Sequence, residues 1–580
     1  MARRVRATRV AAADAEFVRR PDGSLLVRSR RELGPYPRRI TDRLEFWAAK
    51  APERTFLARR NAAGEWDRLT YSETLRRTRD VAQGLIDRKL SPERPVAILS
   101  GNSFDHALLA LGCVYAGVLY APLAPAYSLA TTDYTTLRVI WDSLEPGLVL
   151  AEGAAFGPAV GAAGRGRTEV VASVGAVERT AGAAVDEAHA KVGPNTIAKV
   201  LFTSGSTGHP KGVINTQRMW CSNLAMIGSV LQFMGDKPPV LCDWLPWNHT
   251  FGGHHNFGLT LVNGGTMYMD DGKPVPKHFG TTVRNLKEIA TTAYFNVPKG
   301  YEMLVPELRA DAELRKTFFQ DLNMVFYAAA GLNQKVWDEF QDLAVETVGE
   351  EILMVTGLGA TETGPSAMFT GPEGAASGRV GLPVPGVTVK LAPVAEKLEV
   401  RVKGDSVTPG FWRNEALTRA SFDDEGYYCM GDGVTFVDPA QPQLGFQFDG
   451  RINEDFKMSS GTWVSVGPLR ARFLTHCAGA VQDAVIAGHD RDYVSALLFT
   501  EASRDAVQGL LDSFAALSTG ASTRIARAMV LTEPPSLAAR EITDKGSINQ
   551  KAVLARRRAL VEELYADPAS ERVMIAGDRL

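Results

Sequence analysis

Cysteines are few, long apolar runs are missing and the charges nearly balance. The five cysteines form no C-x-x-C pair, which argues against a zinc site or a disulfide framework. They favour buried, reduced thiols in a cytoplasmic protein. The chain contains no run of about 18 apolar residues, so we expect no membrane-spanning helix. A formal net charge of −2 argues against a protein that binds nucleic acid over its whole surface.

Internal repeats are also missing, which argues against a solenoid. At 580 residues the chain is too long for one hydrophobic core, so we expect several subdomains. Positive charge gathers at the start, where the first forty residues hold eleven arginines and four acidic residues. No apolar secretory segment follows them. We interpret residues 1–39 as a basic N-terminal extension: a solvated tail in the simplest case, an anionic-surface contact or targeting peptide otherwise.

The middle of the chain alternates between strand and helix patterns. Val96–Ser100 is an apolar run followed by a Gly-Asn-Ser turn, and Phe104–Ala116 then has the pattern of a buried helix. This alternation continues to about residue 370 and predicts an α/β fold, after which short strands predict a β-rich subdomain. The turn at Asp449-Gly450-Arg451 predicts a division between a large domain, residues 40–449, and a small C-terminal domain, residues 450–580.

A glycine-rich loop after an apolar strand is the most informative segment. The strand Ala198–Phe202 runs into T-S-G-S-T-G-H-P-K-G, residues 203–212. Small residues let backbone N–H groups approach an anion, while the hydroxyls add donors and the lysine adds a positive charge. The spacing is not that of a Walker A loop. The segment predicts a polyphosphate site made by Thr203, Ser204, Gly205, Ser206, Thr207, Gly208 and Lys211.

This loop resembles the signature of the adenylate-forming superfamily, which includes acyl- and aryl-CoA ligases, luciferases and peptide-synthetase adenylation domains. The other motifs of the superfamily follow in order, and the resemblance covers about residues 40–565. It implies an α/β fold with a large N-terminal domain of stacked α/β subdomains plus a β-rich subdomain, and a small, mobile α+β C-terminal domain. It also implies ATP, Mg²⁺ and coenzyme A as cofactors and a small carboxylic acid as the substrate.

Two motifs resemble the parts of the superfamily that contact the acyl group and the base. Trp244–Phe251, W-L-P-W-N-H-T-F, implies that His249 stands beside the acyl carboxylate. Tyr327–Leu332, Y-A-A-A-G-L, implies that Ala329, Ala330 and Gly331 pack against adenine.

Gly357–Thr363, G-L-G-A-T-E-T, resembles the motif G-Y-G-x-T-E. The resemblance implies that Thr361 contacts the α-phosphate and that Glu362 holds Mg²⁺, a hard cation that prefers carboxylate and phosphate oxygens. We also predict that Thr203 is a second ligand of this metal ion, and we count Thr203 among the catalytic residues. Leu358 stands where the superfamily has tyrosine, so it would cover the adenine without aromatic stacking.

Tyr427–Gly433, Y-Y-C-M-G-D-G, resembles Y-x-T-G-D and implies that Asp432 accepts hydrogen bonds from the ribose hydroxyls. Asp449–Lys457 resembles the hinge between the two domains. Arg451 would also contact the ribose, and Asn453 would be the residue about which the domains rotate. We also predict that Lys457 contacts the cofactor.

The last motif departs from the usual P-x-T-x-x-G-K. The chain has E-I-T-D-K-G-S-I-N-Q-K at residues 541–551. We expect Lys545 to be the lysine that reaches the reacting carboxylate and the α-phosphate, with Lys551 as the alternative.

For the acid, the closest resemblance is to bacterial feruloyl-CoA synthetases, on Phe456–Gly467, Thr543–Gln550 and Asp22–Arg39. It implies ferulate and related hydroxycinnamates. A pocket with aromatic walls suits a flat acid such as a hydroxycinnamate. A benzoate or a medium-chain fatty acid is the alternative substrate. The candidate pocket residues are Trp247, Phe251, Phe257, Tyr294, Asn296 and Tyr327.

Two other classes remain open. One is a stand-alone adenylation enzyme that loads a carrier protein, although no D-S-L or D-S-I attachment serine follows residue 565. The other is an inactive binding protein, which the retained Thr203, Glu362, Asp432 and Arg451 disfavour. The sequence leaves the oligomeric state open.

Overall fold

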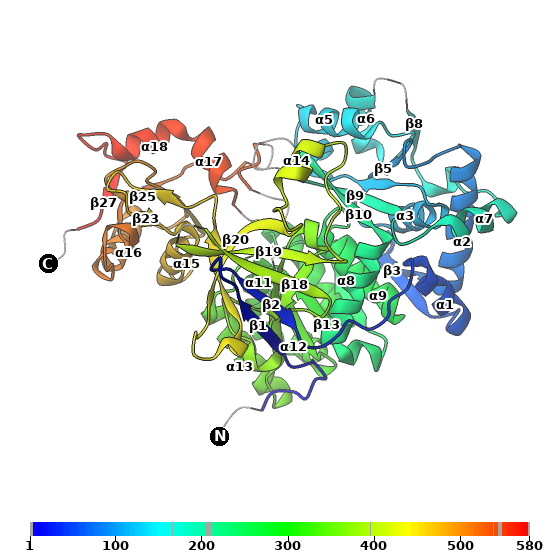
Figure 1. Cartoon of the computed structure of the whole chain (residues 1–580), viewed down its shortest axis with the longest axis horizontal. Helices are drawn as coiled ribbons and strands as arrows, with labels where there is room; N and C mark the ends of the chain where they lie inside the picture. The colour runs from blue at the N-terminus through cyan, green and yellow to red at the C-terminus, as the bar shows by residue number, and fades with distance from the viewer. Residues whose placement is uncertain are drawn as a thin grey trace. The chain divides into compact units, whose positions relative to one another are not determined.

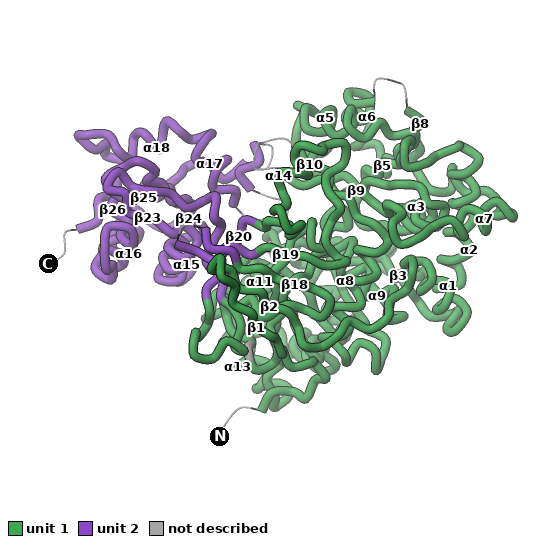
Figure 2. Tube along the Cα trace, viewed as in Figure 1, with its two compact units in different colours: residues 1–391, 401–430, 436–446 green, residues 392–400, 431–435, 447–580 purple. Residues whose placement is uncertain are grey.

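A computed structural model describes residues 4–164, 166, 168–204, 210–328, 330–394, 396–536, 539–542 and 548–577. The chain forms two compact units (Figure 2). Unit 1 comprises Met1–Leu391, Arg401–Met430 and Phe436–Phe446, and unit 2 comprises Ala392–Val400, Gly431–Thr435 and Gln447–Leu580. The predicted division at residues 449 and 450 falls within strand β21 (Phe446–Arg451).

Unit 1 begins its α/β part with a six-stranded sheet in the order β10-β9-β6-β5-β7-β8. The predicted strand-turn-helix is confirmed as β5 (Val96–Leu99) and α3 (Phe104–Ala116). Ser103 caps α3 by accepting a hydrogen bond from His106 N at 3.0 Å, and Gly117 ends it with a φ of 72°. The strands are β5 (Val96–Leu99), β6 (Tyr120–Pro122), β7 (Leu148–Ala151), β8 (Glu169–Val171), β9 (Ile197–Ser204) and β10 (Pro210–Thr216).

A four-stranded sheet follows, in the order β11-β12-β3-β4. Its strands are β3 (Thr55–Arg60), β4 (Trp66–Thr70), β11 (Val240–Asp243) and β12 (Thr266–Met269). The helices up to residue 263 are α1 (Thr41–Lys50), α2 (Tyr71–Asp87), α3 (Phe104–Ala116), α4 (Ala126–Leu129), α5 (Thr135–Leu144), α6 (Gly157–Gly164), α7 (Ala183–Lys191), α8 (Gln217–Val230) and α9 (Phe257–Asn263).

The largest sheet has eleven strands, in the order β1-β2-β18-β19-β20-β21-β17-β16-β15-β14-β13. They are β1 (Ala15–Arg19), β2 (Leu25–Ser29), β13 (Ala293–Asn296), β14 (Met324–Tyr327), β15 (Leu353–Gly359), β16 (Ser366–Phe369), β17 (Arg379–Pro383), β18 (Val387–Val394), β19 (Lys397–Gly404), β20 (Tyr428–Phe436) and β21. Strands β18 to β21 each contain residues of both units.

Strands β13, β14 and β15 are parallel, with Phe295 opposite Phe326 and Phe326 opposite Val355. Helices pack against them around a core that includes Tyr301, Phe318 and Phe340. The remaining helices of unit 1 are α10 (Pro276–Glu288), α11 (Pro298–Ala310), α12 (Ala312–Gln320), α13 (Gln334–Val348) and α14 (Glu415–Ala420). Because parallel strands end at one edge of a sheet, the segments after β13, β14 and β15 emerge together.

The N-terminal extension is folded, so the solvated-tail interpretation is wrong for its described residues. Strands β1 and β2 form an antiparallel hairpin, and β2 pairs with β18, beside which Figure 1 shows the hairpin. The Arg6 guanidinium donates to Leu322 O at 2.6 Å and to Phe319 O at 2.9 Å. These carbonyl partners explain the early arginine better than an anionic surface does.

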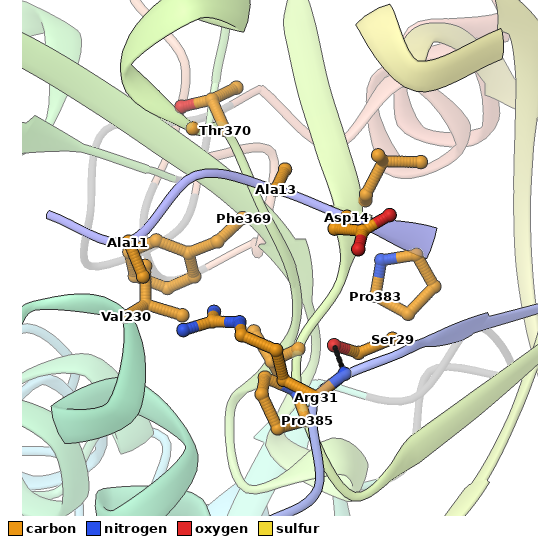
Figure 3. A pocket seen from close by; sticks show the side chains of 13 residues that line it. Ala11, Ala13, Asp14, Ser29, Arg31, Val230, Phe369, Thr370, Pro383 and Pro385 are labelled. Carbon is orange, nitrogen blue, oxygen red and sulfur yellow. Dashed lines mark hydrogen bonds between the residues drawn. The ribbon is translucent and has the colours of Figure 1, made fainter. Parts of the chain in front are cut away.

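The extension also closes a small hollow beside β16 and β17. Figure 3 shows Arg31 and Ser29 on one side of it and Phe369 on the other. Its volume of about 10 Å³ is that of a site for one water molecule. The hollow is therefore a packing feature and too small for a substrate.

Unit 2 is an α+β domain with a four-stranded sheet in the order β24-β25-β26-β27. Its core includes Phe473, Leu511 and Phe514. The described part of the chain has no helix of sufficient length and apolar character to cross a membrane. The elements are β22 (Phe456–Lys457), β23 (Trp463–Val464), α15 (Val466–His476), β24 (Asp483–Ala487), β25 (Val494–Phe499), α16 (Arg504–Ala516), β26 (Ile525–Val530), α17 (Gln550–Arg556), α18 (Arg558–Tyr565) and β27 (Met574–Ile575).

The segment predicted to hold the catalytic lysine is anchored at both ends in unit 2. Ile542 and Ile548 form an antiparallel bridge, and Asn549 N donates to Glu541 O at 2.8 Å. The buried Glu541 carboxylate accepts from Arg557 Nε at 2.7 Å and Arg556 Nη1 at 2.8 Å. Burial acts to raise the pKa of Glu541, but the hydrogen bonds and the arginine charges outweigh it and lower the pKa to about 2.

Val27→Ala should reduce the free energy of unfolding by about 2 kcal/mol, because Val27 in β2 is fully buried and its loss leaves a cavity. Val18→Ala is the matched control in β1, since Val18 is 44% exposed and its change should stay within about 0.5 kcal/mol. Urea unfolding measures both. Equal, negligible effects would mean that the extension does not pack on the sheet.

Glu541→Gln should reduce the free energy of unfolding by about 3 kcal/mol at pH 7, because the buried Arg557 loses its charged partner. Since folding lowers the pKa of this carboxyl, its contribution is present above the ordinary glutamate pKa of about 4.3. It is lost as the pH falls through about 2. The gap between wild type and variant should therefore shrink between these values in urea unfolding at several pH values.

The control for this pH series is Glu562→Gln, which removes an exposed ion pair with Arg491. It should change the stability by less than about 1 kcal/mol at every pH. A gap for Glu541→Gln that does not depend on pH would contradict the assigned ionisation.

Candidate active site

The base of the glycine-rich loop is a β-hairpin. Thr203 near the end of β9 lies opposite Lys211 in β10. The Thr203 Oγ1 atom is buried and has no hydrogen-bond partner within the described ranges. Ser204 is the last residue of β9, and Gly205, Ser206, Thr207 and Gly208 lie outside the described residues. A buried hydroxyl without a described partner is a candidate for contact with a ligand.

Lys211 connects this hairpin to the turn that follows β15. Its Nζ lies 2.7 Å from Glu362 Oε1, and the Glu362 side chain is only 6% exposed. Glu362 belongs to the 3₁₀ turn Thr361–Thr363, where Thr361 is also buried. Lys211 of the predicted phosphate segment and the predicted metal ligand Glu362 are therefore in direct contact.

The carboxylate, hydroxyl and ammonium groups gathered here have the chemistry that a Mg²⁺ ion bound with a polyphosphate requires. A hard cation takes carboxylate and hydroxyl oxygens, which Glu362 and the unpartnered Thr203 provide. Lys211 offers an ammonium group to a phosphate without leaving the hairpin.

Glycines allow the chain to approach closely in this turn. A Cβ at Gly359 would stand 1.7 Å from Pro365 O, and one at Gly357 would stand 2.4 Å from Met368 O. Leu358 between them lies in β15 and is partly buried. Packing alone therefore requires the two glycines of the G-x-G part of the motif.

The predicted adenine segment follows β14. Tyr327 ends the strand, and its carbonyl accepts from Thr356 Oγ1 at 2.7 Å. Ala330 and Gly331 are exposed, and Ala329 lies outside the described residues. The segment emerges at the carboxyl edge of the parallel strands, next to the turn that carries Glu362.

His249 caps a π-helix, Thr250–Asn256. Its Nδ1 accepts a hydrogen bond from Phe251 N at 3.1 Å, so in the neutral ring the proton is on Nε2. A Cβ at Gly252 would stand 2.4 Å from Leu245 O, and one at Gly253 would stand 2.1 Å from Trp247 O. The two glycines let this rare helix fold back on the preceding loop, and π-helices are frequent at functional sites.

The predicted pocket residues fall into different environments. Trp247 packs edge to face on Phe257, with centroids 5.0 Å apart, and its buried Nε1 has no partner among the described residues. Phe251 belongs to a second aromatic group with Phe295 and Phe326. Tyr294 packs in the helical core of unit 1.

Asn296 is engaged in hydrogen bonds. Its Oδ1 accepts from Trp244 Nε1 at 3.0 Å and from Val297 N at 2.8 Å, and its Nδ2 donates to Tyr294 OH at 2.8 Å. These bonds give Asn296 a structural role that the sequence did not suggest.

Two buried charged residues next to the π-helix, Lys199 and Asp243, were not predicted from the sequence. Lys199 is fully buried, its Nζ donates to Gly253 O at 3.0 Å, and it lies 3.6 Å from the Trp220 ring centroid. Burial lowers the pKa of Lys199 well below its ordinary value. Asp243 is also buried, and burial, partly offset by hydrogen bonds from Asn256 and Leu245 N, raises its pKa to about 7. The string G-G-H-H-N was the available signal.

In unit 2 the two predicted ribose residues are neighbours. Arg451 Nε lies 3.6 Å from Asp432 Oδ1. The predicted hinge segment is held by the buried Lys397, which bonds the Asp449 carbonyl and the Asp455 carboxylate on either side of Asn453.

The predicted lysines of unit 2 have different surroundings. Lys457 is exposed and lies 5.2 Å from the Trp463 ring centroid. Lys551 is exposed in α17. Lys545 lies outside the described residues.

Comparison with known proteins agrees with these motifs. Carboxylic acid reductase of Mycobacterium marinum is 25% identical over 467 residues, which cover 70% of this chain and 38% of that protein. Probable 4-coumarate–CoA ligase 2 of Dictyostelium discoideum is 27% identical over 301 residues, 50% of this chain and 51% of that protein. The chain thus spans well under two thirds of either relative. ATP-bound MatB from Rhodopseudomonas palustris shares the fold with a TM-score of 0.68 at 21% identity, over 89% of this chain and 99% of that one.

Family models cover most of the chain. The model of AMP-binding enzymes matches residues 44–412, and that of the AMP-binding enzyme C-terminal domain matches residues 457–569. Together with the motif order, these matches show that the chain belongs to the AMP-binding enzyme family, within the adenylate-forming superfamily.

Proposed function

We propose that the protein is an AMP-forming acid–CoA ligase. It joins a carboxylic acid to AMP and then transfers the acyl group to the thiol of coenzyme A. The observation that carries this proposal is the Lys211–Glu362 pair beside the unpartnered Thr203 hydroxyl. A polyphosphate with a divalent cation would give every one of these groups a partner.

In the first half-reaction a carboxylate oxygen attacks the α-phosphorus of ATP, and the bond to pyrophosphate breaks. His249 donates to the carboxylate through Nε2, and Lys211 with the loop N–H groups stabilises charge on the phosphate oxygens. Thr361 contacts the α-phosphate. Mg²⁺ held by Glu362 and Thr203 supplies further charge neutralisation when bound.

In the second half-reaction the sulfur of coenzyme A attacks the acyl carbonyl. The carbon–oxygen bond to AMP breaks, AMP leaves and the thiol proton passes to solvent. Asp432 and Arg451 hold the ribose, and rotation at Asn453 removes Lys545 from the site between the two halves.

For the substrate we propose ferulate and related hydroxycinnamates. The aromatic side chains of Trp247, Phe251 and Phe257 support a flat aromatic acid. Half of the chain also aligns with a relative named as a probable 4-coumarate–CoA ligase. Benzoates and medium-chain acids are the competing classes.

Pyrophosphate release with ATP and a panel of acids tests this function. Ferulate, 4-coumarate and caffeate should exceed acetate, benzoate and octanoate in kcat/KM by at least about tenfold, because an aromatic pocket gains little from a short or flexible acid. Replacing coenzyme A by a carrier protein gives the control for the acceptor. Turnover that requires the carrier protein, or a fatty acid as the best substrate, would contradict the proposal.

Lys545→Ala should slow the first half-reaction about 10²–10³-fold, the effect of removing one transition-state donor. The second half-reaction, started from feruloyl-adenylate and coenzyme A, should stay near the wild-type rate. Single-turnover measurement of both halves separates this loss from misfolding, which damages both. Lys551→Ala is the matched comparison, and a split seen only in that variant would move the catalytic role to Lys551.

A further inference from the structure

A cavity of about 320 Å³ lies in unit 1 on the side of α8 that faces away from the candidate active site. Asn223 of α8 donates to Ser366 O at 2.8 Å, a few residues after Glu362. Helix α8 lines the cavity with Cys221, Leu224, Ala225 and Gly228. At about 3.6 residues per turn, these four positions centre on the opposite side of the helix from Asn223. The cavity is therefore separate from the groups that we assign to ATP.

The other walls of the cavity come from segments that are distant in the sequence. Residues 34–37 form one wall, and the end of α9 at Val262 and Asn263 forms another. Figure 1 shows α8 and α9 side by side. The walls are chiefly aliphatic, with Pro35, Pro37, Leu224, Ala225 and Val262. Because a cavity of about 150 Å³ holds one benzene molecule, one of twice that size has room for an apolar body of about eight carbons.

Arg43 of α1 is the only charged residue among the described residues that line the cavity. Its Nε and Nη2 both donate to Val262 O, at 3.1 and 2.8 Å, and its Cζ lies 4.5 Å from the Phe46 ring centroid. In the described part of the chain its Nη1 makes no hydrogen bond and the guanidinium has no carboxylate partner. One donor of this cation is thus left for a ligand.

The surroundings of Arg43 favour an anion. Burial lowers the pKa of the partly buried Arg43, but the ordinary pKa of arginine is so high that the side chain stays charged at physiological pH. A charge that is withdrawn from water without a counter-ion is costly, and an anion in the cavity would remove this cost. A carboxylate would also accept a hydrogen bond from Nη1.

We propose that this cavity binds a medium-chain carboxylate, with its head group on Arg43 and its alkyl chain along the apolar side of α8. Aliphatic walls suit an alkyl chain, and the single arginine suits a single negative charge. None of the residues that we assign to catalysis, ATP or the acid substrate lines this cavity. The site is therefore a second binding site, independent of the proposed ligase activity.

Isothermal titration calorimetry of the full chain without ATP tests the site, with octanoate, octanol and octylamine as probes. Octanoate should bind saturably, and the other two should bind at least about tenfold more weakly, because neither forms a charge-assisted hydrogen bond with an arginine. Arg43→Gln should weaken octanoate binding by a similar factor. The matched control is Arg54→Gln, because Arg54 also donates to a backbone carbonyl, Gly264 O at 3.0 Å, but does not line the cavity. It should leave the affinity unchanged.

Gly228→Phe shows where octanoate binds. A Cβ at Gly228 would meet no atom within 4 Å, so the phenyl ring has room to enter the cavity and should abolish octanoate binding. Octanoate bound as a substrate in the candidate active site would not be displaced.

An affinity that neither Gly228→Phe nor Arg43→Gln changes places octanoate elsewhere and overturns the proposal. Equal binding of octylamine, or no saturable binding of octanoate to wild type, overturns it as well. Should Gly228→Phe fail to fold, the difference between Arg43→Gln and Arg54→Gln decides. Failure of the ligase assay would remove the proposed function and leave this binding test unaffected.

Discussion

The parallel register of β13, β14 and β15 is the constraint on which the candidate site depends. Each strand ends at the same edge of the sheet, so the segments after Asn296, Tyr327 and Gly359 emerge side by side. One of these segments carries Glu362, and the hairpin that carries Lys211 meets it through an ion pair. A shift of one residue in this register would turn alternate side chains to the opposite face of the sheet.

In each of the two units a buried charged side chain is satisfied by an ion pair. In unit 1, Glu362 is buried and its described partner is Lys211. A phosphate would compete for the lysine and a metal ion for the carboxylate, so binding both keeps each group neutralised. In unit 2, Lys397 plays a comparable part for the hinge, where it satisfies groups on both sides of Asn453.

The region predicted to contact the acyl group is built mainly from aromatic and imidazole rings. The π-helix at residues 250–256 turns aromatic and imidazole rings toward strands β13 and β14, and Gly252 and Gly253 allow it to lie against the loop before it. Asp243 and Asn256 then orient the His255 ring from behind.

The sequence by itself determined the α/β class and the motif order of the family, and it predicted which residue types would contact phosphate, metal and ribose. Loops such as T-S-G-S-T-G carry their chemistry locally, in small residues and hydroxyls, and so can be identified without coordinates. The sequence did not show that the arginine-rich start packs as a hairpin, since pairing of β2 with β18 joins residues far apart in the chain. Only the tertiary structure decided the Lys211–Glu362 contact and the structural use of Asn296, because each depends on which distant side chain supplies the other half of a hydrogen bond.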